Sequence, residues 1–169
     1  WREELQLPPY QKTTLGGVPV FFLNSGHAGM LNDTQLAWFQ NEVASIPTTQ
    51  EVLIVAHHPS FYSRFEETGL KRVVSTAFRN HAAPVWLLGG HGHAFGEIMF
   101  AAGSRRFIQM EVTTGNPKLF SDSRSPGYAL FGLQNGKMAF RAYRAVLESG
   151  FEIKSKIGQL KAYPLDWAF

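Results

Sequence analysis

The chain has 169 residues, of which 44% are hydrophobic and 17% are charged, a composition typical of a globular protein with a real core and not of a disordered one. The formal net charge is +3, but the basic residues form no run, so the sequence indicates no nucleic-acid surface. The absence of cysteine excludes disulfides and thiolate metal sites, and no apolar stretch approaches the roughly 18 residues that a membrane span needs.

The first third of the chain predicts one strand and one helix. Residues 1–17 carry proline and glycine breakers and are expected to be irregular. An apolar strand is predicted from Val18 to Leu23. A helix is predicted from Asp33 to Ala44, because Asn32 is a favourable N-cap and Gln35 stands at the capping-box position. Its buried stripe is expected to consist of Leu36, Phe39 and Val43.

Two apolar runs in the middle of the chain predict buried strands joined by a helix. The runs are Val52–Ala56 and Val85–Leu88. In a strand–helix–strand unit the carboxyl ends of the two strands face one crevice, which is where α/β proteins bind ligands. Helical spacing between the runs is kept by Leu70, Val73, Val74, Ala77 and Phe78.

The last part of the chain predicts further strands and a hairpin. A strand is expected from Phe107 to Val112, and a hairpin from Tyr128 to Tyr143 whose Asn135-Gly136 pair favours a type I′ turn. Residues 146–169 show no clear period. We therefore expect one α/β unit over residues 1–145 and a C-terminal tail over 146–169.

A histidine motif follows each of the two buried strands. These motifs are Ala56-His57-His58-Pro59 and Gly89-Gly90-His91-Gly92-His93. Pro59 keeps the residue before it out of the helical region, and the glycines let the second loop turn tightly and pass close to a ligand. Neutral imidazole suits Zn, Fe, Cu and Ni, and also Mn where carboxylates join. The two motifs therefore predict metal ligation in the shared crevice.

Together the two motifs resemble the last two motifs of the calcineurin-like metallophosphoesterases, with the purple acid phosphatase branch the most similar. The resemblance runs from about Val18 to Tyr143. It implies that His57 and His91 share one metal ion and that His93 binds a second, the pair being divalent or trivalent Fe, Mn or Zn. The implied reaction is metal-dependent hydrolysis of a phosphate monoester or diester. Only the resemblance bears on the compartment, and it favours an extracytoplasmic one.

The family's earlier motifs, Asp-x-His, Gly-Asp and Gly-Asn-His, do not occur in this sequence. They supply the carboxylates, the bridging Asp and an Asn ligand. The three Asp residues, Asp33, Asp122 and Asp166, stand in other contexts. We therefore expect an α/β fold of the metallophosphoesterase αββα type, a mixed β-sandwich flanked by helices, of which this chain is the C-terminal half only. The expected partner is the N-terminal half as a separate chain, and this chain alone is expected to be inactive.

Other polar residues leave alternatives open. His58 is either a proton donor to the leaving oxygen, a group that supports a ligand, or a packing residue. Arg64 either holds a phosphate by bidentate hydrogen bonds or is a solvated surface residue. His27 and Glu97 are polar surface by default, with a metal or substrate role and support of a ligand histidine as the respective alternatives. The alternative to catalysis is a non-catalytic subunit of an assembly.

Overall fold

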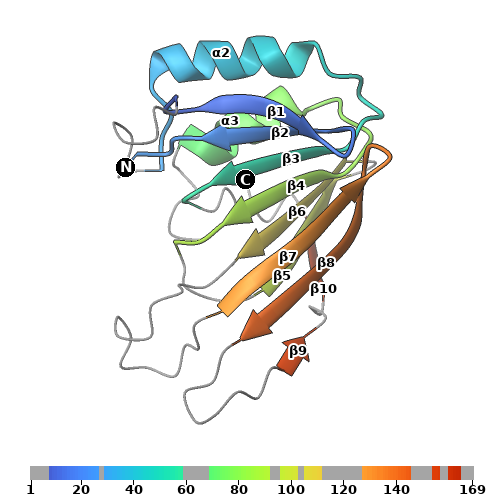
Figure 1. The fold of residues 1–169 in the computed structure, drawn as a ribbon. Coiled ribbons are helices and arrows are strands. Elements are labelled where there is room, and N and C mark those ends of the chain that lie inside the picture. Colours follow the sequence, from blue (N-terminus) through green and yellow to red (C-terminus); the bar gives the residue numbers. More distant parts are fainter. Residues whose placement is uncertain are drawn as a thin grey trace.

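The computed structural model describes residues 8–26, 29–58, 69–91, 96–102, 105–111, 127–145, 154–156 and 160–164. These residues form a seven-stranded sheet, a three-stranded sheet and two helices (Figure 1). The helices are α2 (Asp33–Ala44) and α3 (Gly69–Ala77). In sheet order the larger sheet consists of β1 (Gln11–Leu15), β2 (Val18–Leu23), β3 (Val52–Ala56), β4 (Val85–Gly89), β6 (Arg105–Glu111), β5 (Gly96–Ala102) and β10 (Leu160–Pro164). The smaller sheet consists of β7 (Gly127–Gln134), β8 (Lys137–Ala145) and β9 (Lys154–Lys156).

The middle of the larger sheet is parallel. β2 pairs with β3, β3 with β4, and β4 with β6, all in parallel, whereas β1 and β5 run antiparallel to their neighbours β2 and β6. The chain is thus a mixed α/β protein with a mostly parallel sheet. The carboxyl ends of β2, β3 and β4 lie at the same end of the sheet. The strand–helix–strand pattern predicted this for β3 and β4.

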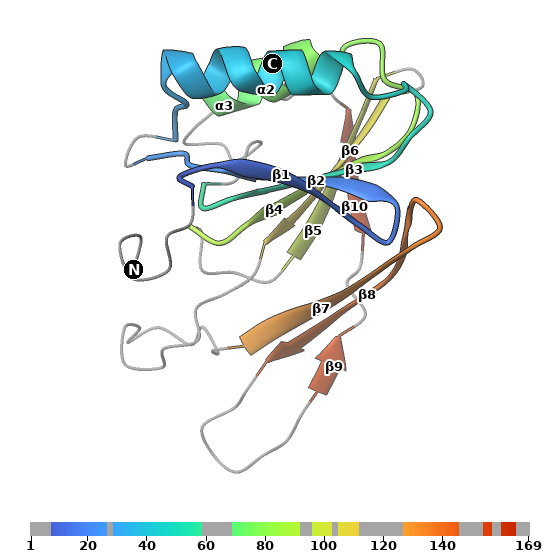
Figure 2. The ribbon, with the colours of Figure 1, turned by 45° about the horizontal axis from the view of Figure 1, so that its top comes forward.

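The two faces of the larger sheet are covered by different layers (Figure 2). Successive residues of a strand point to opposite faces, so Phe21 and Ile54 pack with α2 and α3 while Val20 and Leu53 belong to a second cluster. That second cluster also contacts Phe131, Leu133 and Met138 of β7 and β8. The order of layers is therefore helices, larger sheet, smaller sheet. Neither helix of the described chain has the length and apolar character needed to cross a membrane.

Helix α2 begins and ends at the residues predicted from the sequence, but its buried face differs. The Asn32 side chain accepts a hydrogen bond from the Gln35 backbone N–H at 2.8 Å, which confirms the N-cap. The Gln35 side chain does not reach back to complete a capping box. It is 1% exposed and lies in the buried stripe beside Phe39 and Val43, whereas Leu36 is only half-buried. Burial of its amide is tolerated because both ends of the group are hydrogen-bonded to the backbone of Asn24.

Strand β1 corrects the prediction that residues 1–17 are irregular. The stretch Gln11–Leu15 has no apolar alternation, yet it pairs antiparallel with β2 along its whole length. Lys12 also forms an ion pair with Glu42 of α2, with a distance of 2.9 Å between Nζ and Oε2. β1 lies at the edge of the larger sheet, where backbone pairing to one neighbour and contact with α2 define the strand. The alternation of apolar and polar residues that is typical of a half-buried strand is therefore weak in this stretch.

The turns of two hairpins pack against each other. Asn135 and Gly136 have φ values of 52° and 73°, which confirms the left-handed turn expected between β7 and β8. The Gly136 N–H donates to the carbonyl of Gly16, in the β1–β2 turn, at 2.8 Å. A Cβ atom on Gly16 would lie 1.9 Å from the carbonyl oxygen of Leu133, so this contact requires glycine.

Glu51 joins the two sheets close to these turns. Its Oε2 accepts a hydrogen bond from Trp86 Nε1 at 2.7 Å and another from the Met138 backbone N–H at 3.0 Å. Trp86 belongs to the larger sheet and Met138 to the smaller one. The smaller sheet is thus anchored at the end of the larger sheet where β3 and β4 begin.

The segment 146–169, expected as a tail, contains two short strands. β9 pairs antiparallel with β8, for example Tyr143 with Lys156. β10 pairs in parallel with β5 at the edge of the larger sheet, for example Tyr163 with Phe100. The described parts of this segment therefore contribute to both sheets.

Candidate metal centre

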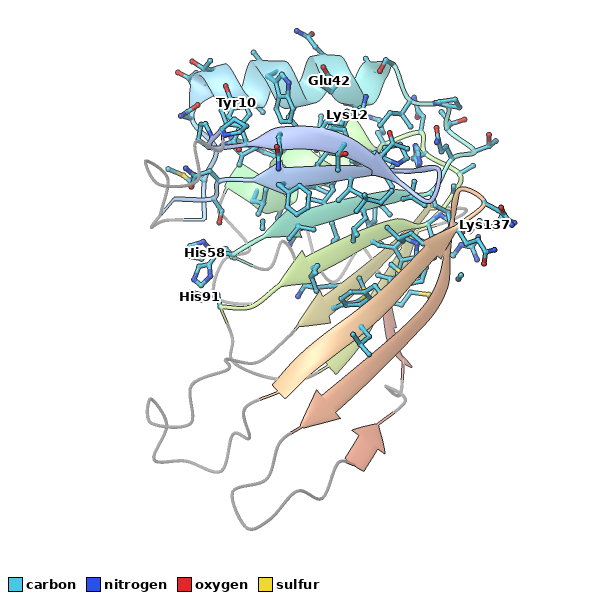
Figure 3. The ribbon with its side chains drawn as sticks, viewed as in Figure 1. Tyr10, Lys12, Glu42, His58, His91 and Lys137 are labelled. Atoms are coloured by element: carbon cyan, nitrogen blue, oxygen red, sulfur yellow. The ribbon has the colours of Figure 1, made fainter. Side chains whose placement is uncertain are left out.

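The two histidine motifs meet where β3 and β4 end. His57 and His58 follow β3, and His91 follows β4 after one intervening glycine. The backbone carbonyl of His57 accepts hydrogen bonds from the N–H groups of Gly90 and His91, both at 3.0 Å. These bonds tie the first motif to the start of the second. Figure 3 shows His58 and His91 at this end of the sheet and Lys137, the first residue of β8, at the other.

Three imidazole rings lie close together at this end of the sheet. His91 Nδ1 lies 3.1 Å from His57 Nε2, and the ring centroids of His58 lie 4.9 Å from those of His57 and 4.5 Å from those of His91. One nitrogen from each ring lies within 4.8 Å of the other two. Tetrahedral zinc with Zn–N bonds of about 2.0–2.1 Å places ligand nitrogens about 3.4 Å apart. The His57–His91 pair already has nearly this spacing.

The donor set of this cluster fits a single ion better than two. His57 is exposed, His91 is half-buried and His58 is 3% exposed. Within the part of the chain that the structure describes, the cluster contains imidazoles and no carboxylate. Three neutral nitrogens suit one zinc-like ion with an open position, whereas a second ion would need ligands from elsewhere.

Ser25 supports His58 from the neighbouring strand. The Ser25 Oγ lies 2.9 Å from His58 Nδ1 and accepts a hydrogen bond from the His58 backbone N–H at 3.2 Å. The parallel register pairs Leu23 with Ala56, so two residues further along Ser25 falls opposite His58. Ser25 is 2% exposed. The sequence did not single it out, although its position two residues beyond a predicted strand was a signal that could have been used.

Several predicted site residues lie outside the described part of the chain. His27, Arg64 and His93 are among them. Glu97 belongs to β5, but only its backbone is described. The metal role of His93, the phosphate contact of Arg64 and the alternatives for His27 and Glu97 therefore stay predictions.

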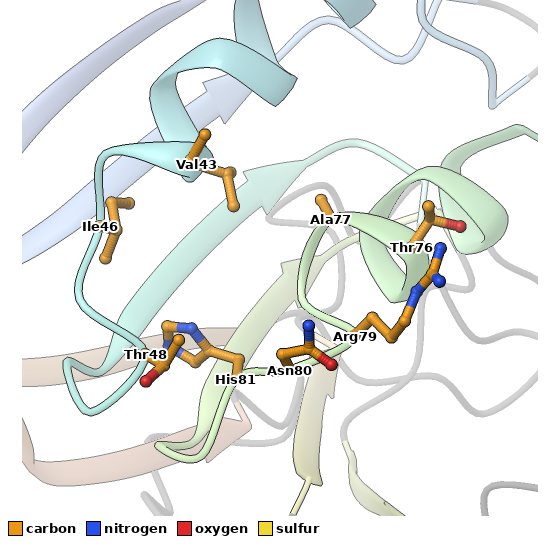
Figure 4. A pocket seen from close by; sticks show the side chains of 9 residues that line it. Val43, Ile46, Thr48, Thr76, Ala77, Arg79, Asn80 and His81 are labelled. Carbon is orange, nitrogen blue, oxygen red and sulfur yellow. The ribbon is translucent and has the colours of Figure 1, made fainter.

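A pocket of about 320 Å³ opens between the C-terminal ends of α2 and α3 and the loops that follow them (Figure 4). His81, one of its lining residues, is 5% exposed, and its Nε2–H donates to the Gln50 carbonyl at 2.7 Å. Burial lowers the pKa of His81, and the hydrogen bond to Gln50 only partly opposes this. A neutral histidine with a satisfied donor is a structural group. His81 is therefore a useful control for the three histidines at the carboxyl ends of β3 and β4.

Comparison with known proteins does not narrow the function of this chain. None of the protein-family models that were searched matches this chain. No curated protein matches its sequence either. The assignment of function therefore depends on the geometry of the three histidines, on the strands that carry them, and on the resemblance of the two motifs.

Proposed function

We propose that this chain is the metal-binding C-terminal half of a metallophosphoesterase that hydrolyses a phosphate monoester or diester. The observation that carries the proposal is the 3.1 Å separation of His57 Nε2 and His91 Nδ1 at the ends of adjacent parallel strands. This edge of an α/β sheet is where ligands bind, and the spacing suits two ligands of one ion. The motif resemblance assigns the same two histidines to one ion, so two independent arguments agree.

The rest of the centre would come partly from this chain and partly from a partner. We assign His93 to the second ion and Arg64 to a phosphate oxygen, and Fe, Mn or Zn to the metal positions. The carboxylates would come from a separate N-terminal half, completing an αββα sandwich. The ions would supply Lewis-acid activation and a nucleophile at neutral pH. The histidines of this chain would hold the ions in place, and Arg64 would orient the ester.

The smaller sheet offers support for a partner chain. In the described strands β7 stands at one end of the order β7-β8-β9. Leu130 on β7 is 53% exposed. An edge strand that carries an exposed apolar side chain is a surface to which a strand of another chain can add. This supports assembly with a second chain but does not by itself specify which one.

The test is to capture the partner and assay the complex. The tagged chain is expected to co-purify with a polypeptide that carries Asp-x-His, Gly-Asp and Gly-Asn-His, and the complex is expected to hydrolyse an aryl phosphate. His57→Ala and His91→Ala should each lower turnover by more than about 100-fold, because removing only the partner of a metal ligand already costs about 10–100-fold. His81→Ala, which removes a buried histidine from the loop after α3, away from the cluster, should leave turnover unchanged. Full turnover in both ligand variants would overturn the proposal.

The imidazole-only cluster also favours a second candidate, a non-catalytic subunit that keeps the fold and one metal. In that case the captured partner would lack the Asp-x-His, Gly-Asp and Gly-Asn-His motifs, or the complex would hold metal without hydrolysing phosphoesters. The same purification therefore separates the two functions.

A further inference from the structure

We infer that His58 is a third ligand of the ion held by His57 and His91, and that Ser25 is the residue that positions it. The inference rests on the proposed metal at His57 and His91. The sequence left three roles open for His58: a proton donor, a group that supports a ligand, or a packing residue. The contacts of its ring and of its backbone favour ligation.

Ser25 holds both the backbone and the ring of His58. The backbone N–H can only donate, so the Ser25 Oγ at 3.2 Å is its acceptor. A hydroxyl oxygen has two lone pairs and can also accept from the ring Nδ1–H at 2.9 Å. Histidines that bind metals commonly donate their other ring N–H to an oxygen in this way. With the proton on Nδ1, the lone pair of the ring is on Nε2, the nitrogen that Ser25 does not engage.

The position of the His58 ring suits an ion better than a substrate. Its side chain is 3% exposed, and its centroid lies within 5 Å of those of His57 and His91, at 4.9 and 4.5 Å. A general acid must reach the leaving oxygen within hydrogen-bond distance, which burial between two other rings and a serine hinders. Ligand nitrogens that are within 4.8 Å of one another need to approach by at most about 1.4 Å to reach tetrahedral spacing. The exposed His57 side chain has room for that movement.

The support of His58 extends into helix α2. The Asn24 N–H donates to Gln35 Oε1 at 2.8 Å, and Gln35 Nε2 donates to the Asn24 carbonyl at 2.9 Å. Asn24 directly precedes Ser25, so a buried amide of α2 fixes the chain that carries the serine. This explains why a glutamine occupies a core position of the helix. It also means that His58 is oriented before an ion arrives.

The experiment is a calorimetric titration of the full chain, without any partner, with zinc chloride at neutral pH. We expect one zinc per chain. His58→Ala and His57→Ala should both weaken zinc affinity by more than Ser25→Ala, for which about a 10–100-fold loss is expected. Two matched controls remove the same residue types elsewhere: His81→Ala and Ser45→Ala, whose Oγ donates to the Glu42 carbonyl at 2.7 Å. Both controls should bind zinc like the wild type.

A second measurement avoids mutation and so does not depend on the folding of the variants. In ¹⁵N spectra of the imidazole rings of the wild-type chain, His58 should be protonated at Nδ1, and its Nε2 signal should shift when zinc is added. If zinc binding is lost in His57→Ala but kept in His58→Ala, and the His58 ring signals do not move, the inference is wrong while the proposed function stands. A wild-type chain that binds no zinc would also overturn the inference, and the two-chain assay would then decide the proposed function separately.

Discussion

The packing of the two hairpin turns can be tested with a pair of glycine substitutions that share one backbone conformation. Gly16 and Gly26 have φ values of +56° and +55°. An alanine at either position therefore meets the same intrinsic cost of a left-handed conformation, about 1–2 kcal/mol. The surroundings differ. Among the described residues, the nearest atom to a Cβ on Gly26 is the Met30 carbonyl oxygen at 3.9 Å, whereas a Cβ on Gly16 would lie 1.9 Å from the carbonyl oxygen of Leu133.

The expected losses of unfolding free energy follow from these distances. Gly26→Ala should cost only the conformational term, about 1–2 kcal/mol. In Gly16→Ala the clash is with backbone, so the two turns must separate. That breaks the 2.8 Å hydrogen bond from Gly136 N–H to the Gly16 carbonyl, a net loss of about 0.5–1.5 kcal/mol, and adds an overpacking cost of about 1–3 kcal/mol. The total for Gly16→Ala is then about 2.5–6.5 kcal/mol.

The assay is urea unfolding of the wild type and both variants, followed by tryptophan fluorescence at one pH and temperature. The difference between the two variants isolates the contact between the turns, because the conformational term is common to both. Equal losses for Gly16→Ala and Gly26→Ala would refute the packing of the β1–β2 turn against the β7–β8 turn.

Two further predictions concern polar groups away from the histidine cluster. Glu51→Ala removes the acceptor shared by Trp86 and Met138 and should lower the unfolding free energy by about 2–4 kcal/mol; Glu51→Gln, which keeps an acceptor oxygen, should lose clearly less in the same urea experiment, and equal losses would contradict the bridge. Burial lowers the pKa of His81 from its ordinary 6.5, so the unfolded chain binds this proton more readily and stability should fall as the pH drops below 6.5, by at most about 1.4 kcal/mol per pH unit. His81→Gln should flatten this dependence between about pH 7.5 and 5.5, and parallel slopes for the two proteins would show that His81 is not its source.

Much of the fold could be predicted from short-range patterns. The bounds of β3 and α2 agree with the predictions from the sequence, because an apolar run of five residues and a capped, periodic segment of twelve carry strong local signals. The Asn135-Gly136 turn was predictable for the same reason, since the turn type demands those residues. Strands β1, β9 and β10 were not predicted. They lie at the edges of their sheets or are very short, and pairing with a neighbour defines them more than their own pattern does.

The candidate site likewise has features that the sequence predicted and features that depend on the tertiary structure. That His57 and His91 would lie close together followed from the sequence, because His57 directly follows, and His91 follows after two glycines, strands that were predicted to be adjacent and parallel. The contact of Ser25 with His58 joins residues 33 positions apart and depends on the register of β2 against β3. Gln35 was expected to cap its own helix, but tertiary structure directs its amide to Asn24 instead.

The sequence by itself thus determined which residue types lie at the crevice and which strands carry them. Strand formation depends on residues that are neighbours in the sequence, and His57 and His91 each follow such a strand. Only the tertiary structure decided which polar partner each of these side chains has. The register between parallel strands and the packing of a helix on a sheet depend on the burial of residues that are far apart in the sequence, so a local pattern alone does not specify them. The orientation of His58 by Ser25 is therefore a property of the packed sheet, whereas the presence of histidines at its edge is a property of the chain.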